Sequence, residues 1–372
     1  MFGRRHQFRE KIKFARRPLR EGREGARISF PVVVFIASLI ISPLIFFTAV
    51  AGERFASKMA SVFSSLKTKT ENGADKPEAP PCLYRHPLDN SCLEERWGNK
   101  KIIAVSIDNH IESRPPSGLS SSRLVIEAPV EGGITRFLAF FGEGDEAPEV
   151  GPVRSARPYF IDWAEEYQAT LAHIGGSPEA LERIKKENIK TIDGITFGSP
   201  FRRVPSREAP HSTYSSAQKL FEAASRGSEP ANPPVLSEAP DSNSGAKRMR
   251  IAAASSAYEI EWKYLNDEER YVRFQGGVKT VDKDGSEIAA KNVLALRMPI
   301  EVIDDEGRRK IGTIGEGEAA IFTGGKIVFG KWIRKSIGDR TSFVDGGGKE
   351  ISLAPGTTWI EIISKGAVME YN

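Results

Sequence analysis

The sequence lacks the short motifs that identify the common enzyme classes. Only two of its 372 residues are cysteines and five are histidines. It contains no Gly-x-Ser-x-Gly elbow, no His-Glu-x-x-His pair and no phosphate loop ending in Gly-Lys-Ser or Gly-Lys-Thr. These absences weigh against a serine hydrolase of the elbow type, a zinc protease and a nucleotide-driven motor.

The sequence also has little excess charge. The formal net charge is +4, and it is concentrated before Ile28, where ten basic residues face three acidic ones. The chain beyond this tail is close to neutral or mildly acidic. A basic tail is poor evidence that a folded domain binds nucleic acid, so we expect no nucleic-acid partner.

Long apolar runs are absent except at residues 28–51, which carry no charge. A helix needs roughly 20 apolar residues to cross a bilayer, so this stretch is predicted to be a transmembrane helix that contacts the lipid. The basic residues on its N-terminal side predict a cytoplasmic N-terminus and an exported remainder, as for a single-pass protein of the cytoplasmic (inner) membrane. A cleaved signal peptide and a buried core helix are the alternatives.

The composition beyond this run predicts two folded parts. We expect a basic tail at 1–27, the span at 28–51, a polar stalk at 52–81, a mixed α/β domain at 82–227, a linker at 228–247 and a β-rich domain at 248–372. The predicted fold class is α+β, with a mixed α/β layered domain followed by a mostly antiparallel β domain. Strands are expected near residues 101–107, 123–129, 133–141, 169–174, 260–264, 271–274, 292–296, 318–322, 326–329 and 359–363, and helices near 157–167 and 179–187.

The two cysteines, Cys82 and Cys92, begin the folded part of the chain. In an exported protein such a pair usually forms a disulfide. Two free thiols are the alternative. A four-ligand zinc site is not favoured, because there is no second cysteine pair and only His86 lies nearby.

Arginines gather in the first domain, and several fall near predicted strand ends. The planar guanidinium group binds phosphate and carboxylate with two parallel hydrogen bonds, so the group could hold a pyrophosphate or an anionic glycan. Arg154 and Arg157 are the best pair, because they precede a helix, and helix N-termini attract anions. The alternative is that the arginines pair with nearby acidic residues and have a structural role. The predicted ligand-binding residues are Arg136, Arg154, Arg157, Arg203, Arg207 and His173.

Acid–base candidates lie in the same domain. A carboxylate at a strand end can hold Mg²⁺ or accept a proton from an attacking hydroxyl group, although no cofactor is required by the sequence. A histidine can act as a general base. Hydrogen bonding within turns is the structural alternative for Glu127 and Glu131, and a structural role is the alternative for the histidines. The predicted catalytic residues are Asp108, Glu127, Glu131 and His211, with His110 beside them, and no metal ligands are predicted.

Several long motifs resemble one bacterial family. They are Asp108-Asn109-His110, the stretches 114–119, 127–138, 151–160 and 173–178, and Ala209-Pro210-His211. These resemble the YerB-like bacterial lipoproteins, whose domain is catalogued as domain of unknown function 3048, and the resemblance runs from about Pro81 to the C-terminus. It implies an envelope location and a shared fold but no known reaction. The apolar span at 28–51 departs from the lipid-modified cysteine that such proteins often carry.

A weaker pattern is similar to the LytR–CpsA–Psr envelope proteins, which transfer polymers linked to polyprenyl pyrophosphate. Here Val153-Arg154-Ser155 would occupy their arginine turn, and residues 171–176 their strand ending in Gly-Gly. Two function classes therefore compete. One is an envelope protein that binds an anionic ligand of phosphate or glycan type, and the other is a phosphotransferase-like enzyme acting on a lipid-linked glycan.

Overall fold

The computed structural model describes residues 82–224 and 245–372, which belong to one compact unit. None of the helices within these two ranges is long and apolar enough to cross a membrane. The predicted tail, span and stalk at 1–81, and most of the predicted linker, lie outside the described residues. The prediction of a mixed α+β fold with a β-rich C-terminal region is confirmed.

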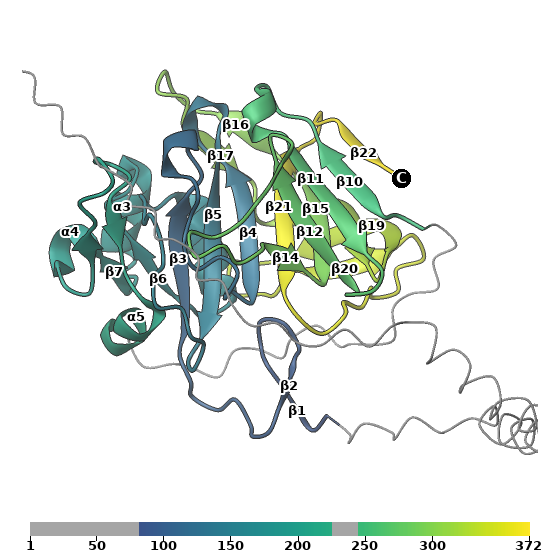
Figure 1. The fold of residues 1–372 in the computed structure, drawn as a ribbon, viewed down its shortest axis with the longest axis horizontal. Helices are drawn as coiled ribbons and strands as arrows, with labels where there is room; N and C mark the ends of the chain where they lie inside the picture. The colour runs from purple at the N-terminus through teal and green to yellow at the C-terminus, as the bar shows by residue number, and fades with distance from the viewer. Residues whose placement is uncertain (1–81, 225–244) are drawn as a thin grey trace, which may run out of the picture. The chain divides into compact units, whose positions relative to one another are not determined.

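A ten-stranded sheet forms the centre of the molecule (Figure 1). It contains strands from both halves of the sequence, because β21 (Thr358–Ser364), near the C-terminus, pairs with β4 (Leu124–Pro129) on one side and β15 (Asn292–Met298) on the other. The remaining strands, in spatial order outward from β15, are β18 (Gly315–Thr323), β19 (Lys326–Arg334) and β20 (Ser342–Asp345). Outward from β4 they are β5 (Thr135–Gly142), β3 (Ile102–Asp108), β6 (Thr170–His173) and β7 (Thr191–Asp193).

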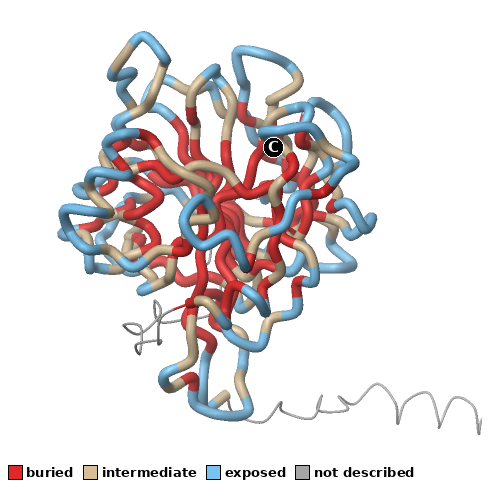
Figure 2. The backbone as a smooth tube through the Cα atoms, turned by 90° about the vertical axis from the view of Figure 1, so that its left-hand side faces the viewer, coloured by how far each residue is buried: buried red, intermediate tan, exposed pale blue. Residues whose placement is uncertain are grey.

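Helices and a second sheet cover the two faces of this sheet. On one face, Ile103, Val105 and Ile107 of β3 pack in a core that also contains apolar residues of helix α5 (Ala217–Ala223) and of the second sheet. On the other face, Ile102 and Ala104 pack in a core with residues of the helices α2 (Pro158–Glu166) and α3 (Pro178–Lys186). All seven residues of β3 are buried for this reason, and the buried chain lies inside a shell of exposed loops (Figure 2).

The second sheet is antiparallel and comes from the C-terminal half. Its main order is β13-β12-β11-β10-β22, and β14 also pairs with β12. The strands are β10 (Arg248–Ile251), β11 (Ile260–Leu265), β12 (Arg270–Gln275), β13 (Val278–Lys279), β14 (Ala289–Ala290) and β22 (Met369–Tyr371). The short pairs are β1 (Tyr84–Arg85) with β2 (Cys92–Leu93), β8 (Arg202–Arg203) with β9 (Thr213–Tyr214), and β16 (Ile300–Val302) with β17 (Arg309–Ile311).

The helices begin where the sequence provides capping residues. A proline occupies the first turn of α2 and of α3, where its fixed φ suits a helix and its missing N–H costs nothing. Ser177 caps α3 by accepting a hydrogen bond from the Ala180 N–H. The helices are α2 (Pro158–Glu166), α3 (Pro178–Lys186), α4 (Gly194–Phe197) and α5 (Ala217–Ala223), with single turns at η1 (Ile111–Ser113), η2 (Glu131–Gly133) and η3 (Ser256–Tyr258).

The predicted cysteine pairing is confirmed. Cys82, just before β1, and Cys92, the first residue of β2, form a disulfide, and their Cα atoms are 5.6 Å apart. The bridge closes a short loop at the beginning of the folded unit.

Candidate functional site

The polar end of β3 organises the candidate site. Asp108 is the last residue of this strand and is only 1% exposed. It lies opposite Arg136 in the antiparallel pairing of β3 with β5. One carboxylate oxygen, Oδ1, accepts a hydrogen bond of 3.1 Å from the backbone N–H of His110. The other oxygen, Oδ2, is left to face side chains from distant parts of the chain.

Two side chains meet Asp108 Oδ2. The His211 Nδ1 atom lies 2.7 Å from this oxygen and the Arg154 Nε atom lies 3.1 Å from it. Arg154 also donates a hydrogen bond of 3.3 Å to the carbonyl oxygen of Pro210, next to His211. The predicted residues Asp108, Arg154 and His211 are therefore brought together, and the Asp108 carboxylate sets the orientation of both partners.

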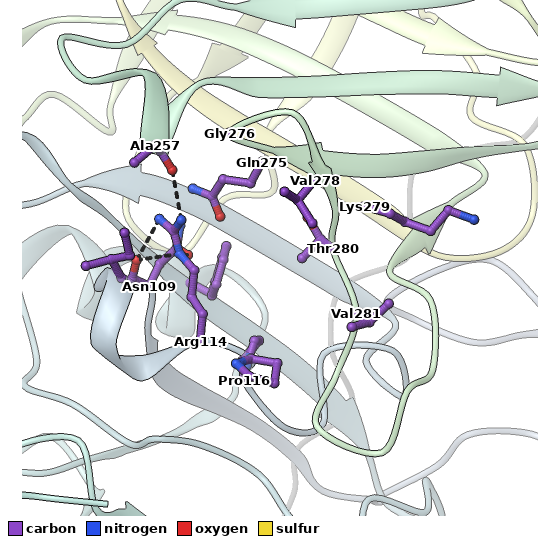
Figure 3. A pocket seen from close by; sticks show the side chains of 13 residues that line it. Asn109, Arg114, Pro116, Ala257, Gln275, Gly276, Val278, Lys279, Thr280 and Val281 are labelled. Atoms are coloured by element: carbon purple, nitrogen blue, oxygen red, sulfur yellow. Dashed lines mark hydrogen bonds between the residues drawn. The ribbon is translucent and has the colours of Figure 1, made fainter.

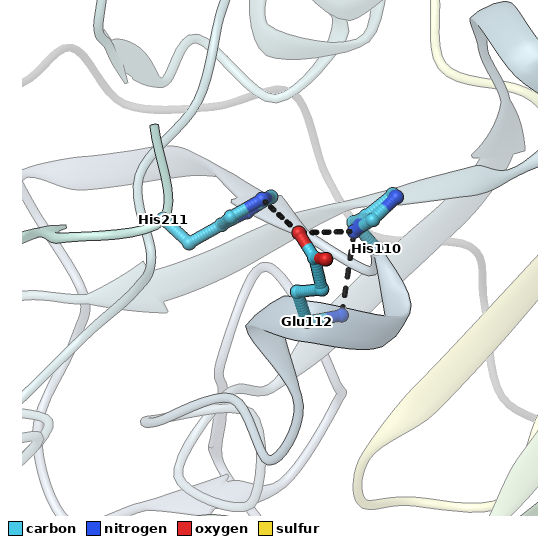
Figure 4. A group of neighbouring side chains, drawn as sticks. All are labelled: His110, Glu112 and His211. Carbon is cyan, nitrogen blue, oxygen red and sulfur yellow. Dashed lines mark hydrogen bonds and ion pairs between the residues drawn. The ribbon is translucent and has the colours of Figure 1, made fainter. Parts of the chain in front are cut away.

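His110 and Glu112 complete this group (Figure 4). A Glu112 carboxylate oxygen lies 3.5 Å from His211 Nε2 and 3.8 Å from His110 Nδ1. The two imidazole rings stack, with centroids 5.1 Å apart. The ligand atoms of these three residues all lie within 4.8 Å of one another, so this group could hold a metal ion. We call Asp108, His110, Glu112, Arg154 and His211 the Asp108 cluster.

Two further arginines of the predicted site, Arg136 and Arg157, lie next to this cluster. Arg136 is buried and donates a hydrogen bond of 3.1 Å to the Ser155 carbonyl oxygen. Burial, together with the positive charges of Arg157 and Arg154, lowers the pKa of Arg136 to about 10. Arg157 makes two hydrogen bonds, of 2.7 and 2.6 Å, to the Glu131 carboxylate. Burial alone would raise the pKa of Glu131, but its bonds to Arg157 lower it.

The remaining predicted ligand-binding residues differ in position. Arg207 lies beside the cluster, where it donates hydrogen bonds to the carbonyl oxygens of Glu112 and Pro115. Arg203 is exposed on β8. His173 is buried, with Nδ1 2.7 Å from the Gly175 carbonyl oxygen and Nε2 3.0 Å from Thr191 Oγ1, and burial lowers its pKa. Both ring nitrogens of His173 thus have partners within the fold.

Glu127 lies in a separate group in the core. Its carboxylate accepts hydrogen bonds of 3.0 and 2.8 Å from Arg273, and both side chains are fully buried. Glu361 lies beside Glu127 in the β4–β21 register and accepts a hydrogen bond of 2.9 Å from the Trp262 indole N–H. Burial and the Glu127 charge raise the pKa of Glu361. We call Glu127, Arg273 and Glu361 the buried acid network.

Sequence reasoning missed Glu112, Arg273 and Glu361. Glu112 follows His110 at a spacing of two, and that pattern would have suggested a shared ligand. Glu361 interrupts the apolar run of β21, and a charged residue within a buried strand usually has a charged partner. No local pattern marks Arg273, whose partner Glu127 is 146 residues away.

A cavity of about 430 Å³ lies on the β12–β13 side of the Asn109–Arg114 segment (Figure 3). Apolar groups, among them Phe137 and Val278, line most of it. The Arg114 guanidinium group donates to the carbonyl oxygens of Asn109 and Ala257, and burial lowers its pKa. This cavity is separate from the Asp108 cluster, although one chain segment contributes to both.

Comparison with known families defines the class of protein. Residues 91–229 match the model described as "Protein of unknown function (DUF3048) N-terminal domain", and residues 249–360 match the corresponding C-terminal domain. The chain therefore belongs to the DUF3048 family, and the predicted resemblance is confirmed.

Relatives within this family have names and a solved structure. The chain is 32% identical over 287 residues to "Putative lipoprotein YerB" of Bacillus subtilis (strain 168), covering 74% of this chain and 85% of that protein. It is also similar to the crystal structure of the YerB protein from Bacillus subtilis, with a TM-score of 0.68 and 29% identity, covering 77% of this chain and 99% of that one.

Proposed function

We propose that this protein is a membrane-associated, extracytoplasmic protein of the bacterial cell envelope that binds an anionic ligand of phosphate or glycan type. The name of the Bacillus subtilis relative supports the envelope location, because a lipoprotein is attached to a membrane. The disulfide between Cys82 and Cys92 agrees with export, since disulfides persist in oxidising compartments.

One observation carries the binding proposal. Three guanidinium groups, from Arg136, Arg154 and Arg157, surround the Ser155 segment. Two carboxylates form ion pairs with them: Asp108 with Arg154 and Glu131 with Arg157. This leaves one surplus positive charge, which a bound anion would balance. Arg154 is the group best placed to contact a ligand, because its side chain is 23% exposed. The Arg157 guanidinium is more enclosed and has two bonds to Glu131.

Calorimetric titration of the full-length protein with pyrophosphate tests this proposal. A charge-assisted hydrogen bond contributes roughly 1.5–3 kcal/mol, so Arg154→Ala should weaken binding by about ten- to a hundred-fold. Arg157→Ala should have a smaller effect on affinity. Arg248→Ala is the matched control, because it also removes an arginine from an arginine–carboxylate pair, on β10 of the second sheet. Equal affinity of the wild type and the Arg154→Ala, Arg157→Ala double variant would reject the site.

The envelope location has its own test. We expect residues 28–51 to span the membrane, with the N-terminus in the cytoplasm and the folded unit outside. An alkaline phosphatase fused to the C-terminus should then be active in a bacterial host. An inactive fusion, together with an active cytoplasmic reporter at the same position, would contradict this topology.

A second function is favoured by the contact between Asp108 and His211. A carboxylate 2.7 Å from Nδ1 of a histidine orients its Nε2 atom as a general base, which a phosphotransferase-like enzyme acting on polyprenyl-pyrophosphate-linked glycans would need. Incubation with such a lipid-linked saccharide, followed by mass spectrometry, should show turnover by the wild type and none by His211→Ala. Absence of turnover by the wild type would leave the binding function alone.

A further inference from the structure

We propose that His110, Glu112 and His211 bind a divalent transition-metal ion of the zinc type. These residues supply two imidazole nitrogens and one carboxylate oxygen, a ligand set found in catalytic zinc sites. The proposal goes beyond anion binding by the arginines, and its test requires no anion. It also assigns His110 and Glu112 a role that the proposed function does not.

The spacing of the ligand atoms is close to what a zinc ion needs. Bonds of about 2.0–2.1 Å in tetrahedral geometry place the ligand atoms about 3.3 Å apart. The Glu112 oxygen lies 3.5 Å from His211 Nε2 and 3.8 Å from His110 Nδ1. All three ligand atoms lie within 4.8 Å of one another, but the stacked rings of His110 and His211 are nearly parallel, so one ring must rotate before both nitrogens point at the ion. His110 is the residue free to turn, because its side chain is 35% exposed, whereas that of His211 is 12% exposed and is held by Asp108.

Asp108 supplies the second layer of the site. A metal-binding histidine usually forms a hydrogen bond from its other ring nitrogen to a carboxylate, which fixes the tautomer and the orientation of the ring. His211 has this arrangement, with Nδ1 2.7 Å from the buried Asp108 carboxylate and Nε2 on the side of Glu112. Asp108 is itself held by the His110 N–H and by Arg154.

The backbone holds the first two ligands close to the end of a buried strand. His110 follows β3 by two residues, and its carbonyl oxygen accepts a hydrogen bond of 2.6 Å from Ser113 Oγ. Glu112 lies in the single turn η1. Its N–H donates to His110 Nδ1 at 3.3 Å, a long bond that a metal ion would replace at that nitrogen. The three ligands are therefore held close together before an ion arrives, and rotation of the His110 ring completes the site.

The ligand types decide which ion fits. Two imidazole nitrogens suit zinc and its transition-metal neighbours, whereas Mg²⁺ prefers oxygen ligands. Asp108 is paired with Arg154, and the Glu112 carboxylate offsets only part of the charge of a bound divalent ion, so the ion adds a net positive charge. Three protein ligands leave a position for water or for an oxygen of an anion. Metal at His211 Nε2 also excludes this atom from acting as a general base.

Cobalt titration of the full-length, chelator-treated protein tests the site, because tetrahedral Co²⁺ has visible absorption bands that Zn²⁺ abolishes on displacement. We expect one saturable Co²⁺ site per chain, displaced by Zn²⁺ and unaffected by millimolar Mg²⁺. Asp108→Asn should weaken Zn²⁺ binding about 10- to 100-fold, and His211→Ala or Glu112→Gln at least as much. Glu208→Gln is the matched control, since this exposed carboxylate lies in the His211 loop and outside the ligand set.

Two outcomes would overturn the proposal. One is the absence of saturable binding of Co²⁺ or Zn²⁺ by the wild type. The other is equal affinity of the wild type and Glu112→Gln, a surface substitution that leaves the fold intact, as circular dichroism would verify. Pyrophosphate binding without metal, lost in Arg154→Ala, would support the anion site separately, so failure of one proposal is distinguishable from failure of the other.

Discussion

The Asp108 cluster and the buried acid network are both built from carboxylates and basic side chains, but they differ in how far these side chains are exposed to solvent. In the network, Glu127 and Arg273 are fully buried, and Glu127 accepts bonds from Arg273, Asn109 and Thr135. In the cluster, Asp108 is buried, but its partners reach the surface: the side chains of Arg154, His211 and Glu112 are 23%, 12% and 72% exposed. The comparison shows that a charged group becomes a candidate site when its partners still face solvent.

The two regions should therefore respond to different measurements. The network joins β4 and β12, which come from the two halves of the sequence, so its loss should reduce stability. The cluster lies where β3 ends, so its loss should reduce binding.

Arg273→Met should have the largest effect on stability. It leaves the Glu127 carboxylate buried without its cation, and breaking a buried ion pair costs about 3–5 kcal/mol. Chemical denaturation of the wild type and the variant measures this difference. Arg248→Met, which breaks an exposed pair with Glu261, should cost less than about 1 kcal/mol. Similar stability of the two variants would contradict the assignment of the network as a structural element.

Arg154→Lys should reduce pyrophosphate affinity while leaving stability nearly unchanged. A lysine ammonium group keeps the charge but cannot form two parallel hydrogen bonds to an oxyanion, so it should recover only part of the affinity that Arg154→Ala loses. Calorimetry of the three proteins gives the comparison. Full recovery by lysine would show that charge alone, without the guanidinium geometry, determines binding.

The smallest effect concerns pH. Burial and the Glu127 charge raise the pKa of Glu361 above its ordinary value of 4.5. A carboxyl group whose pKa is higher in the folded protein than in the unfolded chain stabilises the fold below its unfolded pKa, and this contribution is lost as the pH rises through the folded-state pKa. The melting temperature should therefore fall with rising pH more steeply in the wild type than in Glu361→Gln.

Scanning calorimetry from about pH 5 to about pH 8 checks this difference. Titrating groups that do not contact Glu361 are common to both proteins, so their contributions cancel when the two profiles are subtracted. Parallel profiles would mean that Glu361 does not keep its proton in the folded state over this range.

Much of the fold could be predicted because it depends on local patterns. The β-branched run of β3 and the proline at the start of α2 placed both elements to within a residue or two. The pairing of β21 between β4 and β15 could not be predicted, because no local signal states which strands of the two halves become neighbours. This pairing is what joins the two halves in one sheet.

The candidate site shows the same limit. Residue type and position at a strand end or in a loop identify Asp108, Arg154 and His211 as candidates one by one. Their contact could not be predicted, because His211 is 103 residues from Asp108 and reaches it only through the packing of the loop after β8. Glu127 also has a carboxylate side chain, yet it is buried in the core with its partner Arg273. The difference between Asp108 and Glu127 is whether their partners are buried, and a single sequence reveals burial poorly.

A crystal structure of the protein with pyrophosphate bound would show directly whether the Arg154 guanidinium binds the anion. We expect pyrophosphate to lie at the end of β3 and to contact Arg154, while Glu127, Arg273 and Glu361 keep their present contacts. Pyrophosphate bound elsewhere, for example at Arg114 in the separate cavity, with Arg154 still paired only with Asp108, would contradict it.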